Sequence, residues 1–117
     1  MWSDPRDAAY VYEMMERIAR IEELVAEHDR DLFLANIAAP HALAMHFLVL
    51  GETANKLSKS FQAAVPVVEW RKIINLRHLI AHEYREIDHA ELWRLSLKEI
   101  PTLKAALPPL PPPSEIF

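Results

Sequence analysis

Apolar residues recur every three or four positions along most of this 117-residue chain, which is the spacing of amphipathic helices. A first helix of roughly twenty residues is predicted to open at Ser3-Asp4-Pro5, because a capping residue, an early acid and a first-turn proline are typical of a helix start. The charged residues between positions 13 and 23 form its solvent-exposed face. Its apolar positions are Val11, Met15, Ile18, Ile21, Leu24 and Val25.

A second long helix is predicted to begin at Pro40, after a short helical turn at residues 31–34. Its apolar residues follow an unbroken spacing of four and three, which is typical of a helix packed among other helices. Gly51 lies inside it, and a helical glycine costs about 1 kcal/mol relative to alanine. We therefore expect another backbone to approach closely at Gly51. The apolar residues are Leu43, Phe47, Leu50, Ala54, Leu57 and Phe61.

The second half of the chain predicts two more helices. Residues 65–68 should form a short extended connector, because Pro66 disfavours helix in the residue before it. A third helix then runs from residue 69 or 70 into the region 77–84. A fourth begins at Asp88, where Glu91 three residues later completes a capping box. Leu92, Trp93, Leu95 and Leu97 supply its apolar residues, and Pro101 ends it or opens a last turn.

These elements predict an all-α fold, an up-and-down antiparallel bundle of four to five helices over residues 1–107. Residues 108–117 form a separate tail that holds five of the nine prolines. We expect residues 108–113 of this tail to be a polyproline II arm that runs over the surface or beyond it.

Composition removes several classes of protein from consideration. A single glycine disfavours tight β-hairpins and glycine-rich nucleotide loops, and the absence of cysteine excludes disulfides, thiolate nucleophiles and zinc–thiolate centres. No His-Glu-x-x-His pattern occurs, so we predict no metal site and no cofactor. The longest apolar run, residues 47–50, is far too short to span a membrane, and no signal peptide is recognisable. We expect a soluble cytoplasmic protein.

Charge is distributed unevenly along the chain. The net charge of −4 argues against nucleic-acid binding by the domain as a whole. Residues 1–55, however, carry four arginines against ten acids, whereas residues 56–117 carry nine basic residues against seven acids. The segment 71–85 is the most basic, with four cations and one acid. A polyanion is therefore expected to bind the second half of the chain.

The segment 71–85 also gathers the residues that could carry chemistry. Arg77 could clamp a phosphoryl group through its planar guanidinium, and His82 could move a proton near neutral pH. Five residues turn the two side chains about 140° apart on an ideal helix, so either the helix loosens near His82 or two copies of the chain share a site. The alternative is a purely structural role, in which the Arg and His side chains stabilise the C-terminal end of the helix dipole and Tyr84 is half buried.

The spacing Arg77-x4-His82-x-Tyr84 resembles the Arg-x4-His-x-Tyr motif of HepT-like toxins, a branch of the HEPN ribonuclease superfamily of helical domains. The resemblance is collinear over roughly residues 3–104. His78 departs from the pattern, because the family commonly has Asn or Asp after the motif arginine. The further matching stretches are Ser3-Asp4-Pro5-Arg6-Asp7, Gly51-Glu52-Thr53-Ala54, Val65-Pro66 through Trp70, Asp88, Trp93 and Ile100-Pro101-Thr102-Leu103.

The resemblance implies a metal-independent endoribonuclease toxin of a type VII-like toxin–antitoxin system. His82 would be the general acid or base for attack by the RNA 2′-hydroxyl, and Arg77 would stabilise the charge on the phosphorane-like oxygens. A homodimer with a shared active-site cleft would supply both an acid and a base. The residues expected to support this site or to hold flanking phosphates are His78, Tyr84, Arg71, Lys72 and Arg85. Glu52 and Asp31 are candidates for residues that support Arg77 or His82.

The resemblance also implies a partner. HepT-like toxins pair with a minimal nucleotidyltransferase antitoxin, in a complex that can be larger than a dimer, and the antitoxin transfers AMP to the motif tyrosine. Adenylylation of Tyr84 would add bulk and negative charge where an RNA phosphate binds. Two alternatives stay open. One is a catalytically inactive HEPN-type subunit that binds a nucleotidyltransferase, and the other is a helical interaction protein without a ligand.

Overall fold

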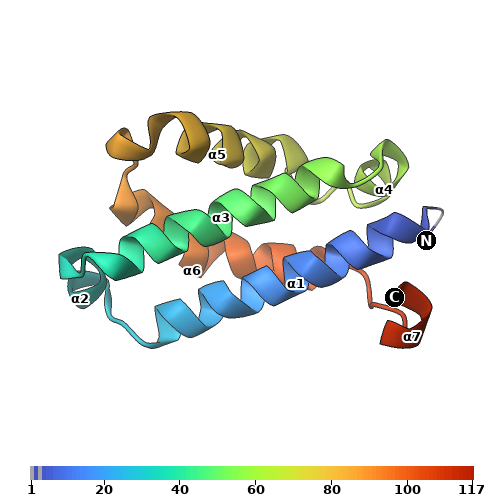
Figure 1. Cartoon of the computed structure of the whole chain (residues 1–117), viewed down its shortest axis with the longest axis horizontal. Coiled ribbons are helices and arrows are strands. Elements are labelled where there is room, and N and C mark those ends of the chain that lie inside the picture. Colours follow the sequence, from blue (N-terminus) through green and yellow to red (C-terminus); the bar gives the residue numbers. More distant parts are fainter. Residues whose placement is uncertain (1, 3) are drawn as a thin grey trace.

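The computed structural model describes residues 2 and 4–117, and this described part is all-α, without a strand. Figure 1 shows successive long helices running in opposite directions, so the predicted antiparallel bundle is confirmed. The long helices are α1 (Pro5–Ala26), α3 (Ala38–Lys56), α5 (Trp70–Glu83) and α6 (His89–Ala106). The short ones are α2 (Arg30–Ala35), α4 (Lys59–Ala64), the 3-10 helix η1 (Tyr84–Glu86) and α7 (Pro113–Ile116).

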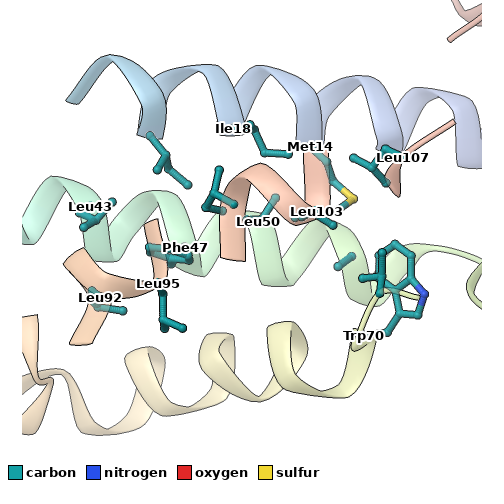
Figure 2. Packing of buried hydrophobic residues seen from close by; sticks show 14 of the residues in the cluster. Met14, Ile18, Leu43, Phe47, Leu50, Trp70, Leu92, Leu95, Leu103 and Leu107 are labelled. Carbon is teal, nitrogen blue, oxygen red and sulfur yellow. The ribbon is translucent and has the colours of Figure 1, made fainter. Parts of the chain in front are cut away.

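The core lies among α1, α3 and α6, and α5 packs on the outer side of α3 (Figure 1). Figure 2 shows buried side chains from all four long helices, with Met14 from α1 and Leu50 from α3 among them. Met14 is fully buried, whereas Met15, which the sequence predicts on the apolar face, is only partly buried. Both are apolar and adjacent, so the helical pattern alone could not distinguish which one faces the core.

The first helix begins as predicted, although its cap is Asp4. The Asp4 carboxylate accepts a hydrogen bond from the backbone N–H of Arg6, and Pro5 is the first helical residue. Ser3, the other residue of the predicted start, lies outside the described residues. The predicted short helical turn at residues 31–34 is confirmed as part of α2, which Asp29 caps through the N–H of Leu32.

The second long helix ends at Lys56, so its predicted extension to Phe61 is wrong. The Ser58 side chain accepts the N–H of Phe61 and starts α4 instead. The buried carboxylate of Asp7 holds this junction, because it accepts hydrogen bonds from the Ser58 N–H at 2.8 Å and the Ser58 hydroxyl at 2.5 Å. The apolar spacing continues across the break because Leu57 and Phe61 are buried on both sides of it.

Two further expectations are corrected near the end of the bundle. Residues 65–68 form a turn, closed by the Val68 N–H on the Val65 carbonyl, rather than an extended connector. Pro101 lies inside α6, which continues to Ala106. A helical proline leaves the carbonyl four residues earlier without its partner. That residue is Leu97, which is exposed although predicted on the apolar face.

The proline-rich tail runs over the surface of the bundle. Residues 107–112 are not helical, and the four-residue helix α7, which the sequence does not predict, contacts α1. The ring of Phe117 meets the ring of Tyr12 edge-on, with centroids 5.2 Å apart. Figure 1 shows α7 beside the first turns of α1. Within the described residues, no helix combines the length and apolarity that a membrane span requires.

Candidate functional site

The candidate residues lie on α5, whose start is anchored by Trp70. Its indole N–H donates to the backbone carbonyls of Gln62 and Val65, 3.1 Å from each, and its ring packs against Phe61. Trp70 is buried, so these bonds satisfy its one donor without contact with water. The first turn of α5 is therefore tied to α4 and the turn that follows it.

Gly51 sets the approach of α5 to α3. A Cβ atom at Gly51 would lie 2.6 Å from the Cβ of Arg77 and 2.8 Å from the carbonyl oxygen of Ile73. Side chains do not tolerate such distances, so only glycine permits this crossing. The predicted close approach of a second backbone at Gly51 is confirmed, and the residue directly opposite is the motif arginine.

Glu52, the next residue along α3, orients Arg77. The Nε–H of Arg77 donates to Oε1 of Glu52 at 2.7 Å. Among the described residues this is the only hydrogen bond of the Arg77 guanidinium, so both Nη groups keep their donors for a ligand. The side chains are 32% and 43% exposed, which leaves the pair accessible from solvent. Glu52, a candidate for support of Arg77, is thus brought to it.

His78 and His82 lie side by side on the exposed side of α5. Their ring centroids are 4.5 Å apart, and both side chains are exposed. They share a surface groove of about 460 Å³. Its other lining residues are Lys72, Asn75, Leu76, Leu79 and Glu83. Lys72, Asn75, Leu79 and His82 follow helical steps of three, four and three, a signal in the sequence that identifies Asn75 and Leu79 as further candidates.

Arg77 and His82 therefore face different sides of α5 in one chain. Arg77 is directed to α3 and does not line the groove of His82. The helix does not loosen before His82, because α5 stays α-helical through Glu83 and the 3-10 turn starts only at Tyr84. A loosened helix is therefore the wrong explanation for the 140° offset between Arg77 and His82. The other explanation, a site shared between two copies of the chain, remains a prediction.

Tyr84 is 60% exposed, more than the half-buried position that a purely structural role predicts. It begins η1, and the guanidinium of Arg85 lies 6.0 Å from its ring centroid. A second hollow is lined by His82, Glu83, Tyr84, Arg85 and Glu86, so the motif histidine and tyrosine border the same space. The Tyr84 side chain is therefore open to solvent.

The remaining candidates are dispersed. Lys72 lines the groove and pairs with Glu69 at 3.5 Å, and Arg71 is exposed on the same helix. Asp31 lies on α2, where its carboxylate contacts Arg30 at 3.6 Å. Within residues 2 and 4–117, Asp31 makes no contact with the motif residues, so the structure does not bring it to the site.

Other histidines of the chain lie outside this arrangement. The Nη1 of Arg17 donates to Nδ1 of His46 at 3.1 Å, and burial, followed by Arg17 and Arg20, lowers the pKa of His46 below its ordinary value. His41 donates through Nδ1–H to the carbonyl of Ile37, four residues earlier. In the described part of the chain no group of three or more His, Asp or Glu side chains could hold a metal ion.

Comparison with known proteins decides the family. The family model described as "Ribonuclease HepT-like" matches residues 14–110, which include most of α1 and all of α3, α5 and α6. The chain belongs to the HepT-like ribonuclease family. The resemblance seen in the sequence is thereby confirmed, and Arg77, His82 and Tyr84 all lie inside the matched region.

Individual relatives match at low identity over most of their length. The "Putative RNase MJ1380" of Methanocaldococcus jannaschii is 25% identical over 82% of this chain and 88% of its own. The "Probable ribonuclease HepT" of Thermococcus cleftensis is 27% identical over 81% and 86%, and the "Putative RNase TTE0752" of Caldanaerobacter subterraneus is 27% identical over 77% and 84%. No solved structure matches.

Proposed function

We propose that this chain is a metal-independent endoribonuclease, the toxin of a type VII-like toxin–antitoxin system in the cytoplasm. The observation that carries the proposal is the Arg77–Glu52 pair, in which Nε is bonded to a carboxylate while both Nη groups remain available. Such a guanidinium presents a fixed fork to phosphoryl oxygens. The family match and the exposed His82 on the same helix support the assignment.

The reaction follows from the groups present. The 2′-hydroxyl of RNA attacks the adjacent phosphorus and loses its proton to a base, while the 5′-oxygen of the next nucleotide leaves and gains a proton from an acid. His82 serves in one of these two roles. The Nη groups of Arg77 donate to the non-bridging oxygens, whose negative charge increases in the transition state. Arg71, Lys72 and Arg85 hold flanking phosphates, with His78 beside His82.

A homodimer completes the proposed site. Arg77 and His82 face different sides of α5 in one chain, and a single His82 provides only one proton-transfer group. Two copies that meet along α5 bring two Arg77/His82 pairs into one cleft and supply both an acid and a base. Leu79, a large apolar side chain exposed on this face, supports a protein contact there.

Purified protein should therefore cut RNA in the presence of EDTA. We expect Arg77→Ala and His82→Ala each to lower the cleavage rate by about a hundredfold or more, because each removes a group that acts in the transition state. A gel assay with end-labelled RNA measures the rate, and circular dichroism verifies that the variants are folded. Arg94→Ala, which removes an exposed arginine of α6 paired with Glu91, is the matched control and should cut normally.

Two results would contradict this proposal. Cleavage that persists in both variants would come from a contaminating nuclease. A folded, unmodified protein without cleavage would favour the inactive HEPN-type subunit, and if Arg77→Ala also left partner binding and toxicity unchanged, it would favour an interaction protein without a ligand.

Tyr84 is proposed as the residue modified by a minimal nucleotidyltransferase antitoxin. Its exposed phenol borders the same hollow as His82, so a transferred AMP group would fill space that the RNA needs and add a phosphate charge. Incubation with a cognate transferase and ATP should add the mass of AMP to wild type and lower cleavage. Tyr84→Phe should gain no mass, whereas Tyr12→Phe, which alters a tyrosine of α1, should be modified normally. An unchanged gain in Tyr84→Phe would refute this assignment.

A further inference from the structure

The histidine pair on α5 has the spacing of a two-ligand metal site. His78 and His82 are four residues apart on one continuous helix, so a single turn of backbone fixes their separation. When two imidazoles bind one ion through nitrogens at about 2.0–2.1 Å, and the N–metal–N angle lies between a right angle and the tetrahedral angle, their ring centroids are about 4.5–5 Å apart. The observed centroid distance is 4.5 Å.

The surroundings leave room for an ion and its water ligands. Both histidines are exposed and line the groove of about 460 Å³, so water can complete the coordination of an ion that the two imidazoles hold. Lys72 lines the same groove, and its positive charge repels a divalent cation and so weakens binding. Imidazole ligands suit zinc, copper and nickel rather than magnesium or calcium, so they favour a late first-row ion.

The geometry points to reversible binding of a late first-row divalent ion, represented here by Zn²⁺, between His78 and His82. The ion is an inhibitor and not a cofactor. If His82 transfers a proton in RNA cleavage, which rests on the proposed function, a ring nitrogen held by the metal can no longer do so. His78 is the residue that makes the inhibition possible, because it provides the second ligand on the same helix.

A second ring pair provides the internal comparison. His41 on α3 and His89 at the start of α6 have ring centroids 5.5 Å apart. They belong to separate helices, α3 and α6, and neither residue lies on α5. His41→Gln therefore removes one imidazole without touching α5 and is the matched control for His78→Gln.

Isothermal titration of the full chain with zinc chloride tests binding directly. Wild type should bind Zn²⁺, and His78→Gln and His82→Gln should each bind at least about tenfold more weakly, since the second ligand of a chelate acts at high effective concentration. His41→Gln should bind like wild type. Zinc should also raise the Tm of wild type and His41→Gln but not of the α5 variants, because the ion binds only the folded pair. Equal binding by His78→Gln, or loss of binding in His41→Gln, would overturn the site.

Inhibition is measured separately. Zinc at a saturating concentration should stop cleavage of RNA by wild type, and EDTA should restore it. The residual cleavage by His78→Gln should be less sensitive to zinc. If zinc binds and wild type still cuts RNA, the inhibitory role is wrong while the site stands. If no preparation cuts RNA, the proposed function fails, and the titration alone decides whether the metal site exists.

Discussion

Arg77 has a partner that its own helix does not supply. A carboxylate 25 positions earlier in the chain holds Nε at 2.7 Å and so fixes the plane of the guanidinium. The same carboxylate places negative charge near the proposed phosphate site, so it weakens RNA binding while it orients the group that acts in the transition state. Glu52 is therefore a positioning residue rather than a catalytic one.

Glu52→Ala should separate these two effects. We expect kcat to fall on the order of tenfold to a hundredfold, since a guanidinium displaced by about 1 Å loses its alignment, while KM stays the same or decreases. Glu52→Gln keeps an acceptor oxygen and should recover part of kcat. Steady-state cleavage of a short RNA measures both constants.

The control for this prediction removes a similar carboxylate elsewhere. Glu22 of α1 pairs with Lys104 of α6 at 3.2 Å and is 44% exposed, close to the 43% of Glu52. Glu22→Ala should leave kcat unchanged. If Glu52→Ala instead raised KM and left kcat unchanged, Glu52 would contribute only to RNA binding.

The crossing of α3 and α5 positions the site at the level of secondary structure. Gly51 allows α5 to lie so close that Arg77 comes within reach of Glu52. The atoms that a methyl group would meet include the backbone carbonyl of Ile73, which cannot move aside as a flexible side chain can. Any substitution at Gly51 must therefore separate the two helices and displace Arg77.

Gly51→Ala should destabilise the protein by up to about 2 kcal/mol. Overpacking costs about 1–3 kcal/mol, and the better helix propensity of alanine returns about 1 kcal/mol of it. Urea unfolding followed by circular dichroism measures the difference. Asn55→Ala, at an exposed position four residues further along α3, gains helix propensity without a clash and should be neutral or stabilising. Stabilisation by Gly51→Ala would show that α5 moves away at little cost.

The arrangement of the whole molecule leaves α5 at the edge of the bundle. It packs mainly on α3, and the side that carries His78, Leu79 and His82 is exposed. Figure 1 shows α5 outside the layer formed by α1 and α3. An edge helix with the proposed catalytic residues on two of its sides suits the proposed cleft between two copies.

A shared cleft has a kinetic consequence that subunit mixing can measure. If both His82 side chains of a dimer are needed, a wild-type/His82→Ala heterodimer is inactive, and activity falls with the square of the wild-type fraction. After exchange by unfolding and refolding, an equal mixture should retain about a quarter of the activity of wild type alone, against about half if each chain works independently. An equal mixture with His41→Ala should lose no activity. A linear decrease would exclude a site that needs both His82 side chains, and with it the proposed supply of acid and base by the two copies.

The sequence alone sufficed for those features that depend on neighbouring residues. Helix positions follow from apolar spacing, Asp4, Asp88 and Pro5 mark helix starts, and a single buried glycine predicts a close crossing. The motif arginine, histidine and tyrosine were recognisable through the resemblance to HepT-like toxins, since all three lie close together in the sequence.

Only the tertiary structure decided features that depend on residues distant in the chain. Ser58 donates hydrogen bonds to the carboxylate of Asp7 at the point where the middle helix ends, before Phe61, although the apolar spacing continues. The choice between Met14 and Met15 follows from the orientation of α1 against its neighbours. Glu52 becomes the partner of Arg77 only because α3 and α5 cross at Gly51. Local propensity acts over one or two helical turns, whereas these contacts exist only after the helices have packed.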